Sequence, residues 1–117
     1  MPKRAHEPAE LLPLKPIELS VLTALSEEER YGYDIVKRIA ESSAGAVKLA
    51  PGNLYSVLDR LIGAGLIQET RRADTEDERR RYYGVTALGR RVLVAEAARL
   101  RELLRTVEGL APAGRLR

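Results

Sequence analysis

The stretch that decides the fold runs from Leu49 to Val85. It reads LAPGNLYSVLDRL (residues 49–61), GAGLI (63–67), RRADTEDERR (71–80) and RYYGV (81–85). This order predicts a helix, a glycine-bearing turn, a strand, a charged hairpin tip and a second strand. A short helix followed by a basic two-stranded ribbon is typical of a winged helix. In such a domain the helix fits the major groove of duplex DNA, and the ribbon reaches the backbone or the adjacent minor groove.

The composition fits a small protein of the reducing interior of a cell. The 117 residues suffice for one domain with a modest core, and the net charge of +3 is compatible with one basic face. The absence of cysteine excludes disulfides, thiolate metal sites and a cysteine nucleophile. Because there is no apolar run long enough to span a bilayer and no signal-peptide stretch, we expect a cytoplasmic protein without a membrane partner.

Two further helices are expected before the deciding stretch. Ile17, Val21, Leu22 and Leu25 recur at helical spacing, and a second helix is predicted from about Tyr31. The segment 47–49 reads equally as a short strand or an extended connector. The expected fold is mainly α with a two-stranded β-hairpin. A flexible arm (1–13) precedes a winged helix-turn-helix domain (14–85).

The last predicted helix carries an unusual apolar seam. Thr86 is a good N-cap for a helix over residues 86–110, followed by a frayed tail (111–117). Apolar side chains then alternate at spacings of four and three, as in a coiled coil. They are Leu93, Ala97, Leu100, Leu104 and Val107. The alternative is packing against the helix's own domain, but a domain this small has little core to cover, so we predict a homodimer.

Helix 51–63 and the hairpin are the candidate DNA-binding elements. With the apolar positions of the helix buried, Asn53, Tyr55, Ser56 and Arg60 face outward or sideways, and the free N–H groups of its first turn can bind phosphate. The alternative is an ordinary amphipathic helix in which Arg60 is a structural ion-pair partner.

Arginines cluster at the base of the hairpin, and four carboxylates occupy its tip (residues 74–78). Mixed charge is common in a solvated loop, and the acidic tip argues against deep insertion into the minor groove. We expect phosphate contacts from the arginine-rich stems, and whether the wing also enters the groove is left open.

Catalysis has little support in this sequence. The single histidine, His6, lies in the arm, and the sequence has no Ser/His/Asp set, histidine cluster or phosphate-binding glycine loop. We therefore expect no enzyme activity, no cofactor and no metal.

Several short motifs resemble the PadR family of transcriptional regulators. They are YGYDI (31–35), PGNLY (51–55), LDRL (58–61), GLI (65–67), RRYY (80–83) and TALG (86–89), and their order covers residues 14–110. The resemblance is to the small subfamily with a single dimerisation helix. It implies a homodimeric repressor that binds a palindromic operator in double-stranded DNA and often responds to a small-molecule effector. It also places Tyr31, Asn53 and Tyr55 near the DNA.

The residues expected at the DNA are Tyr31, Pro51, Gly52, Asn53, Tyr55, Ser56, Arg60, Arg72, Arg79, Arg80 and Arg81.

Two departures from the family pattern matter. Ala50 stands where members often have Ser or Thr as an N-cap, and the chain has no Trp and no Phe. An effector is therefore expected between the last helix and the DNA-binding domain, without an aromatic sandwich. A winged helix that docks protein instead of DNA is the alternative function.

Overall fold

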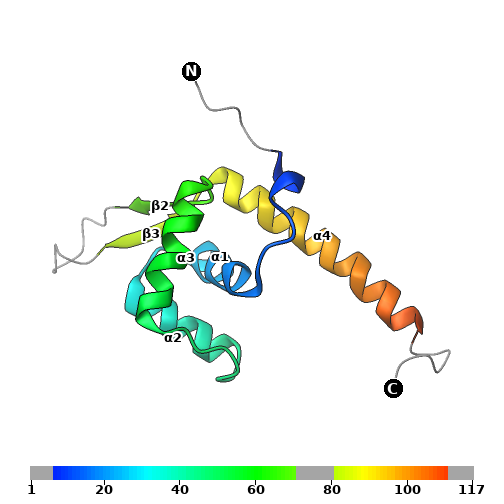
Figure 1. The fold of residues 1–117 in the computed structure, drawn as a ribbon, viewed down its shortest axis with the longest axis horizontal. Coiled ribbons are helices and arrows are strands. Elements are labelled where there is room, and N and C mark those ends of the chain that lie inside the picture. The colour runs from blue at the N-terminus through cyan, green and yellow to red at the C-terminus, as the bar shows by residue number, and fades with distance from the viewer. Residues whose placement is uncertain (1–6, 71–80, 111–117) are drawn as a thin grey trace.

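The structure is a computed structural model that describes residues 7–70 and 81–110. Four α-helices and a small antiparallel sheet make up this part of the chain, which confirms the mainly α prediction (Figure 1). In chain order the elements are η1 (Pro8–Leu11), α1 (Pro16–Glu27), β1 (Arg30–Tyr31), α2 (Gly32–Ser42), α3 (Pro51–Gly63), β2 (Ile67–Thr70), β3 (Tyr82–Val85) and α4 (Ala87–Leu110).

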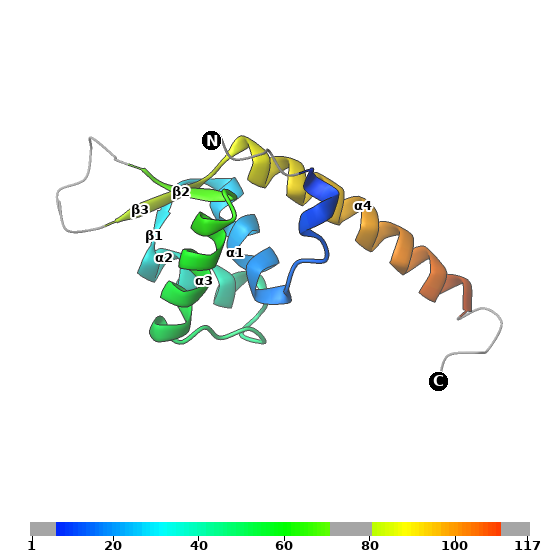
Figure 2. The same ribbon diagram turned by 45° about the horizontal axis from the view of Figure 1, so that its top comes forward.

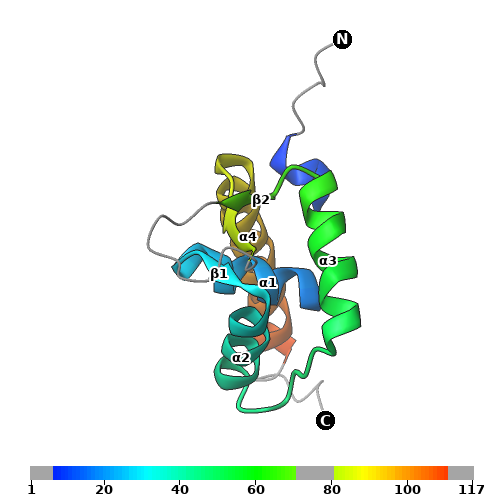
Figure 3. The same ribbon diagram turned by 90° about the vertical axis from the view of Figure 1, so that its left-hand side faces the viewer.

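The core lies where α1 is enclosed by the other helices (Figure 3). The apolar stripe of α1 supplies Val21, Leu22 and Leu25, all buried, as the helical spacing predicts. The buried stripes of α2 and α3 pack against it, and Val92 of α4 closes the cluster from the far side. The arrangement leaves one face of α3 and most of the second half of α4 outside the core.

The sheet has three strands in the order β1-β3-β2, where the sequence predicted two. The hairpin pairs as expected, with Ile67 opposite Val85 and Thr70 opposite Tyr82. The additional strand is the pair Arg30–Tyr31, which lies opposite Tyr83 and Tyr82. Its two residues are too few to show a period-two pattern, so the sequence gave no signal for it. Residues 47–49 form no strand, so they are the extended connector.

A buried arginine joins α1 to α2. The guanidinium of Arg30 donates from Nε to the carbonyl of Ala24 (2.8 Å) and from its other nitrogens to Glu27 and Asp34 (both 3.2 Å). The side chain is 9% exposed, so these bonds compensate the cost of removing its charge from water. Arg30 therefore fixes the angle between the first two helices.

The N-terminal segment is bound to α4 instead of lying loose as expected for residues 1–13. Residues 8–11 form a 3-10 turn against α4 (Figure 2), and the backbone N–H of Leu14 donates to Glu96 Oε2 (2.9 Å). Glu96 is only 1% exposed and also accepts from Arg99 Nε. Arg99 first, and then the Leu14 N–H, lower the pKa of the Glu96 carboxyl although burial opposes them.

The start of α4 is held against the end of α3. The N–H of Gly89 donates to Thr86 Oγ1 (3.0 Å), which confirms Thr86 as the N-cap. The same hydroxyl donates to the carbonyl of Gly65 (2.6 Å), and the N–H of Thr86 donates to the carbonyl of Leu66 (3.0 Å). The last turn of α3 and the first turn of α4 thus share one small hydrogen-bonded junction.

Gly89 is required by that close approach. A Cβ built there would overlap the Leu66 carbonyl oxygen and lie 2.6 Å from Val85 Cγ2. Gly89→Ala should lower the free energy of unfolding by about 1–3 kcal/mol, the usual cost of overpacking. Gly109→Ala is the matched control, because a Cβ there meets nothing within 4 Å. Urea denaturation compares the two, and equal stabilities would show that the junction is loose.

Replacing Glu96 tests how α4 is fastened to the domain. Glu96→Gln should cost about 1–3 kcal/mol at pH 7, since charged hydrogen bonds to Leu14 and Arg99 are weakened. Because the folded pKa is lowered, this stability is present above the unfolded value of about 4.3 and is lost as pH falls through the folded pKa. The deficit of the variant should therefore shrink in acid.

The matched control is Glu102→Gln. Glu102 makes the same i,i+3 pair with Arg105 on an exposed turn of α4. Its replacement should change the urea midpoint little. A Glu96→Gln variant as stable as this control at pH 7 would contradict the fastening role.

Candidate nucleic-acid interface

The face of α3 that points away from the core is polar and built of small residues at its centre. Leu54, Val57, Leu58 and Leu61 are buried, and positions at helical spacing on the opposite side are exposed. Gly52, Ser56 and Asp59 run along the middle of that exposed side, Asn53 and Arg60 lie on one flank, and Tyr55 lies on the other. We call this side the outward face of α3.

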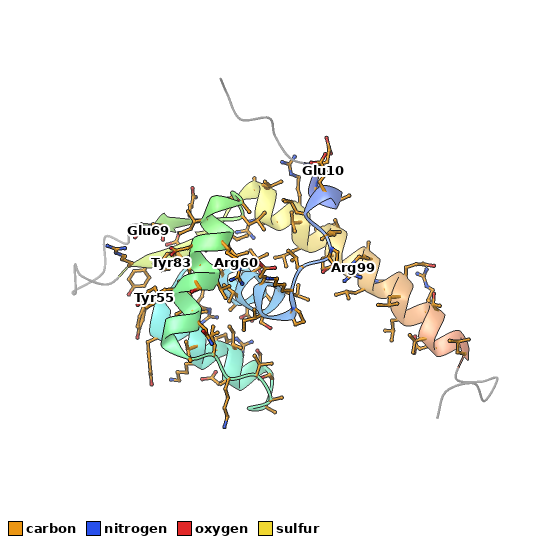
Figure 4. The ribbon with its side chains drawn as sticks, viewed as in Figure 1. Glu10, Tyr55, Arg60, Glu69, Tyr83 and Arg99 are labelled. Atoms are coloured by element: carbon orange, nitrogen blue, oxygen red, sulfur yellow. The ribbon has the colours of Figure 1, made fainter. Side chains whose placement is uncertain are left out.

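The Arg60 flank turns toward α1 (Figure 4). Arg60 Nε lies 3.5 Å from Glu18 Oε2, and Glu18 Oε1 accepts from the backbone N–H of Lys15 (2.9 Å). Arg60 thus has a carboxylate partner on another helix, as the structural alternative allowed, while its side chain stays half-exposed. Its contact with DNA remains a prediction.

The Tyr55 flank turns toward the start of α2. Tyr55 is 56% exposed, and its hydroxyl lies 3.5 Å from the place where a side chain on Gly32 would begin. Tyr33, in the first turn of α2, is 71% exposed, although the sequence analysis did not select it. An exposed tyrosine at a helix start has no pattern that marks it in a single sequence.

Tyr31 occupies a different environment from Tyr55. Its ring packs edge-on against the Tyr82 ring, with centroids 5.5 Å apart, so it forms part of the sheet. Tyr83 is buried under the hairpin, and burial first, then the Glu69 carboxylate, raises the pKa of its hydroxyl. Tyr83 is therefore neutral at physiological pH and serves as packing beneath the interface.

The stem of the hairpin presents an exposed arginine at its base. Arg81 lies just before β3, with Nε 3.7 Å from Glu69 Oε1 on β2. This exposed pair is too weakly held to withhold Arg81 from a phosphate. Thr70 on the same stem donates to Glu29 (3.0 Å), which ties the hairpin to the turn before β1. The predicted wing residues Arg72, Arg79 and Arg80 lie outside the described residues.

The first turn of α3 has no side-chain cap. Ala50 is the N-cap residue and makes no side-chain hydrogen bond, as its substitution for Ser or Thr predicted. The backbone of Pro51 begins the helix, and nothing is described of its side chain. N–H groups at an uncapped helix start are free to bind water or an anion.

The second half of α4 exposes apolar side chains. Of the predicted seam, Leu93 is half-buried against its own core, while Ala97, Leu100, Leu104 and Val107 are exposed. Leu103 is exposed beside them, although its position lies outside the four-three spacing. These side chains continue the buried stripe of α4 beyond the point where the domain ends.

In the described residues there is no cluster of His, Asp or Glu side chains suited to a metal ion. None of the helices in residues 7–70 and 81–110 is both long and apolar enough to cross a membrane.

Comparison with known proteins identifies the family. Residues 21–95 match the transcriptional regulator PadR-like family, which spans the winged helix and the first half of α4. The chain belongs to the PadR-like family of transcriptional regulators. Members of this family are DNA-binding regulators, so the outward face of α3 lies on a DNA-binding fold.

Individual relatives agree with this assignment. A PadR-like regulator from Bacillus cereus has 27% identity and a TM-score of 0.69 over 81% of this chain and 90% of that one. A PadR family regulator from Clostridium difficile, at 23% identity, shares the fold with a TM-score of 0.71 over 83% of this chain and 99% of that one. A protein from Lysinibacillus sphaericus, named only as uncharacterized, is 30% identical over 72% of this chain and 80% of its own length.

Proposed function

We propose that this PadR-like protein is a homodimeric repressor that binds a palindromic operator in duplex DNA and resides in the cytoplasm. The observation that carries the proposal is the outward face of α3, which is exposed, polar and uncapped at its start. Asn53, Tyr55, Ser56 and Arg60 are the proposed readers, and the hairpin arginines, with Arg81 the one described, are the proposed phosphate contacts. A protein seated on promoter DNA excludes polymerase, so binding alone suffices for repression.

The exposed seam of α4 supports the dimer. Leu100, Leu103, Leu104 and Val107 lie together at helical spacing beyond the domain. A monomer would leave this apolar stripe in water, whereas a second α4 would cover it with the same residues under two-fold symmetry. A two-fold dimer then presents two α3 helices, as a palindromic site requires.

The direct test is fluorescence anisotropy with duplex DNA from upstream of the gene. The logarithm of the association constant should fall with the logarithm of the salt concentration, with a slope of about −0.9 per phosphate contacted. A scrambled duplex of the same composition serves as the control and should bind at least about a thousandfold more weakly. Equal, salt-insensitive or undetectable binding to both would favour a protein-docking winged helix instead.

Leu104→Asp tests the dimer. A charge placed in the apolar seam would have to be buried, which costs several kcal/mol and should yield a monomer. Ala98→Asp is the matched control, because Ala98 is also exposed but lies on the opposite side of α4. Light scattering should show a dimer for the wild type and the control, and a wild-type monomer at micromolar concentration would contradict the proposal.

Gly52→Ala separates folding from binding. A Cβ at Gly52 meets nothing within 4 Å, so packing gives no reason for glycine in this helix. The variant should be more stable by up to about 1 kcal/mol, the difference in helix propensity. If DNA backbone approaches this position closely, the same methyl group should weaken operator binding.

The control for Gly52→Ala is Gly109→Ala in α4, whose Cβ also meets nothing within 4 Å. It should gain stability in the same way and bind operator like the wild type. Thermal denaturation and anisotropy measure the two properties. Tighter or unchanged operator binding by Gly52→Ala would contradict a close DNA approach to the start of α3.

A further inference from the structure

A cleft of about 520 Å³ lies between the first turn of α1, the segment that joins α2 to α3, and α3 itself. These three parts of the chain lie beside one another in Figure 2. Its volume falls within the range of about 300–1,000 Å³ that is usual for small-molecule sites. It lies away from the space between α4 and the DNA-binding domain where the sequence analysis expected an effector.

The floor of the cleft is apolar. It is formed by Ile17 from α1, Val47 and Leu49 from the connector, and Val57 from α3. Leu49 and Val57 belong to the buried core, and Ile17 and Val47 pack against it. A ligand seated here would therefore rest its apolar body on the edge of the hydrophobic core.

The rim carries polar side chains without internal partners. Within the described residues, Ser20, Lys48, Asn53 and Ser56 make no side-chain hydrogen bond or ion pair with the rest of the chain. Arg60 completes the rim, and only its 3.5 Å contact with Glu18 holds it. Two cations, two hydroxyls and an amide thus border one apolar floor.

This combination selects for one kind of ligand. The apolar floor favours a hydrocarbon or aromatic body, and Lys48 and Arg60 favour a carboxylate at one end. A cationic ligand would be repelled by both, and a purely apolar one would leave the rim groups to water alone. Arg60 retains donors for a ligand carboxylate because Glu18 contacts it through Nε only.

We propose that this cleft binds a small amphipathic carboxylate and that the ligand and DNA exclude each other at α3. The exclusion rests on the proposed function, because Asn53, Ser56 and Arg60 are shared between the cleft and the proposed DNA-reading set. A bound carboxylate would neutralise positive charge and occupy polar groups on the flank that faces DNA. Ligand and DNA therefore weaken each other's binding by the same factor.

The experiment uses 3-phenylpropionate as the probe and 3-phenylpropionamide as its neutral counterpart of the same shape. Protein without DNA is titrated and followed by two-dimensional amide NMR. The acid should shift the signals of residues 46–49 and 53–57, and the amide should bind about tenfold more weakly or worse. Equal binding of acid and amide, shifts confined to α4, or no shifts at millimolar probe would overturn the proposal.

Lys48→Gln tests the carboxylate contact within the same titration. It should weaken binding of the acid about tenfold while leaving binding of the amide unchanged. Lys37→Gln is the matched control, because Lys37 is an exposed lysine on α2 and does not line the cleft. Equal effects of the two substitutions would show that the acid responds to overall charge instead of to this site, and would overturn the proposal.

A second measurement adds the acid to the protein–operator complex. It should lower the anisotropy of labelled operator in the wild type at a concentration where Lys48→Gln keeps its operator bound. Operator binding that the acid leaves unchanged, with the cleft filled, would overturn the exclusion. If the protein bound no DNA while the acid still filled the cleft, the proposed function would fail and the ligand site would stand.

Discussion

The junction between the end of α3 and the start of α4 determines how the two candidate surfaces are related. Thr86 bonds to the carbonyls of Gly65 and Leu66, and its hydroxyl also accepts from the N–H of Gly89. Gly89 lets the helix approach so closely that no side chain fits there. Because one residue satisfies both helix ends, the direction of α4 follows from the position of α3.

A second contact makes that direction rigid. The buried Glu96 binds Leu14, 82 residues earlier in the sequence, and so links α4 to the segment before α1. A charged acceptor buried in this way would be costly without the Arg99 partner and the Leu14 N–H. With both ends of the buried part of α4 fastened, the exposed seam projects from the domain at a fixed angle (Figure 1). A dimer formed through that seam would therefore hold its two α3 helices at a fixed separation.

The sequence predicts the parts of this structure that depend on local periodicity. The apolar spacing of α1 and α3, the paired strands 67–70 and 82–85, and the Thr86 cap all follow from patterns within about ten residues. The third strand, the fixed turn at residues 8–11 and the buried Glu96 do not. Each depends on a partner elsewhere in the chain, and a polar residue in a helix reads as exposed until its partner is known.

The candidate DNA surface divides in the same way. Helical spacing correctly places Asn53, Tyr55, Ser56 and Arg60 outside the core, but it cannot say what each one faces. The structure shows Arg60 paired with Glu18 and Tyr55 beside Gly32, so the two flanks of α3 have different neighbours. The Tyr31 ring packs within the sheet, against Tyr82.

The fixed separation of the two α3 helices is the central claim, and a distance between spin labels measures it. The chain has no cysteine, so Asp59→Cys on the outward face gives one label per protomer. Pulsed electron resonance on the dimer should give one narrow distance near a turn of B-DNA, about 34–36 Å. A broad distribution, a distance far from any multiple of that spacing, or no dipolar signal at all would contradict the account.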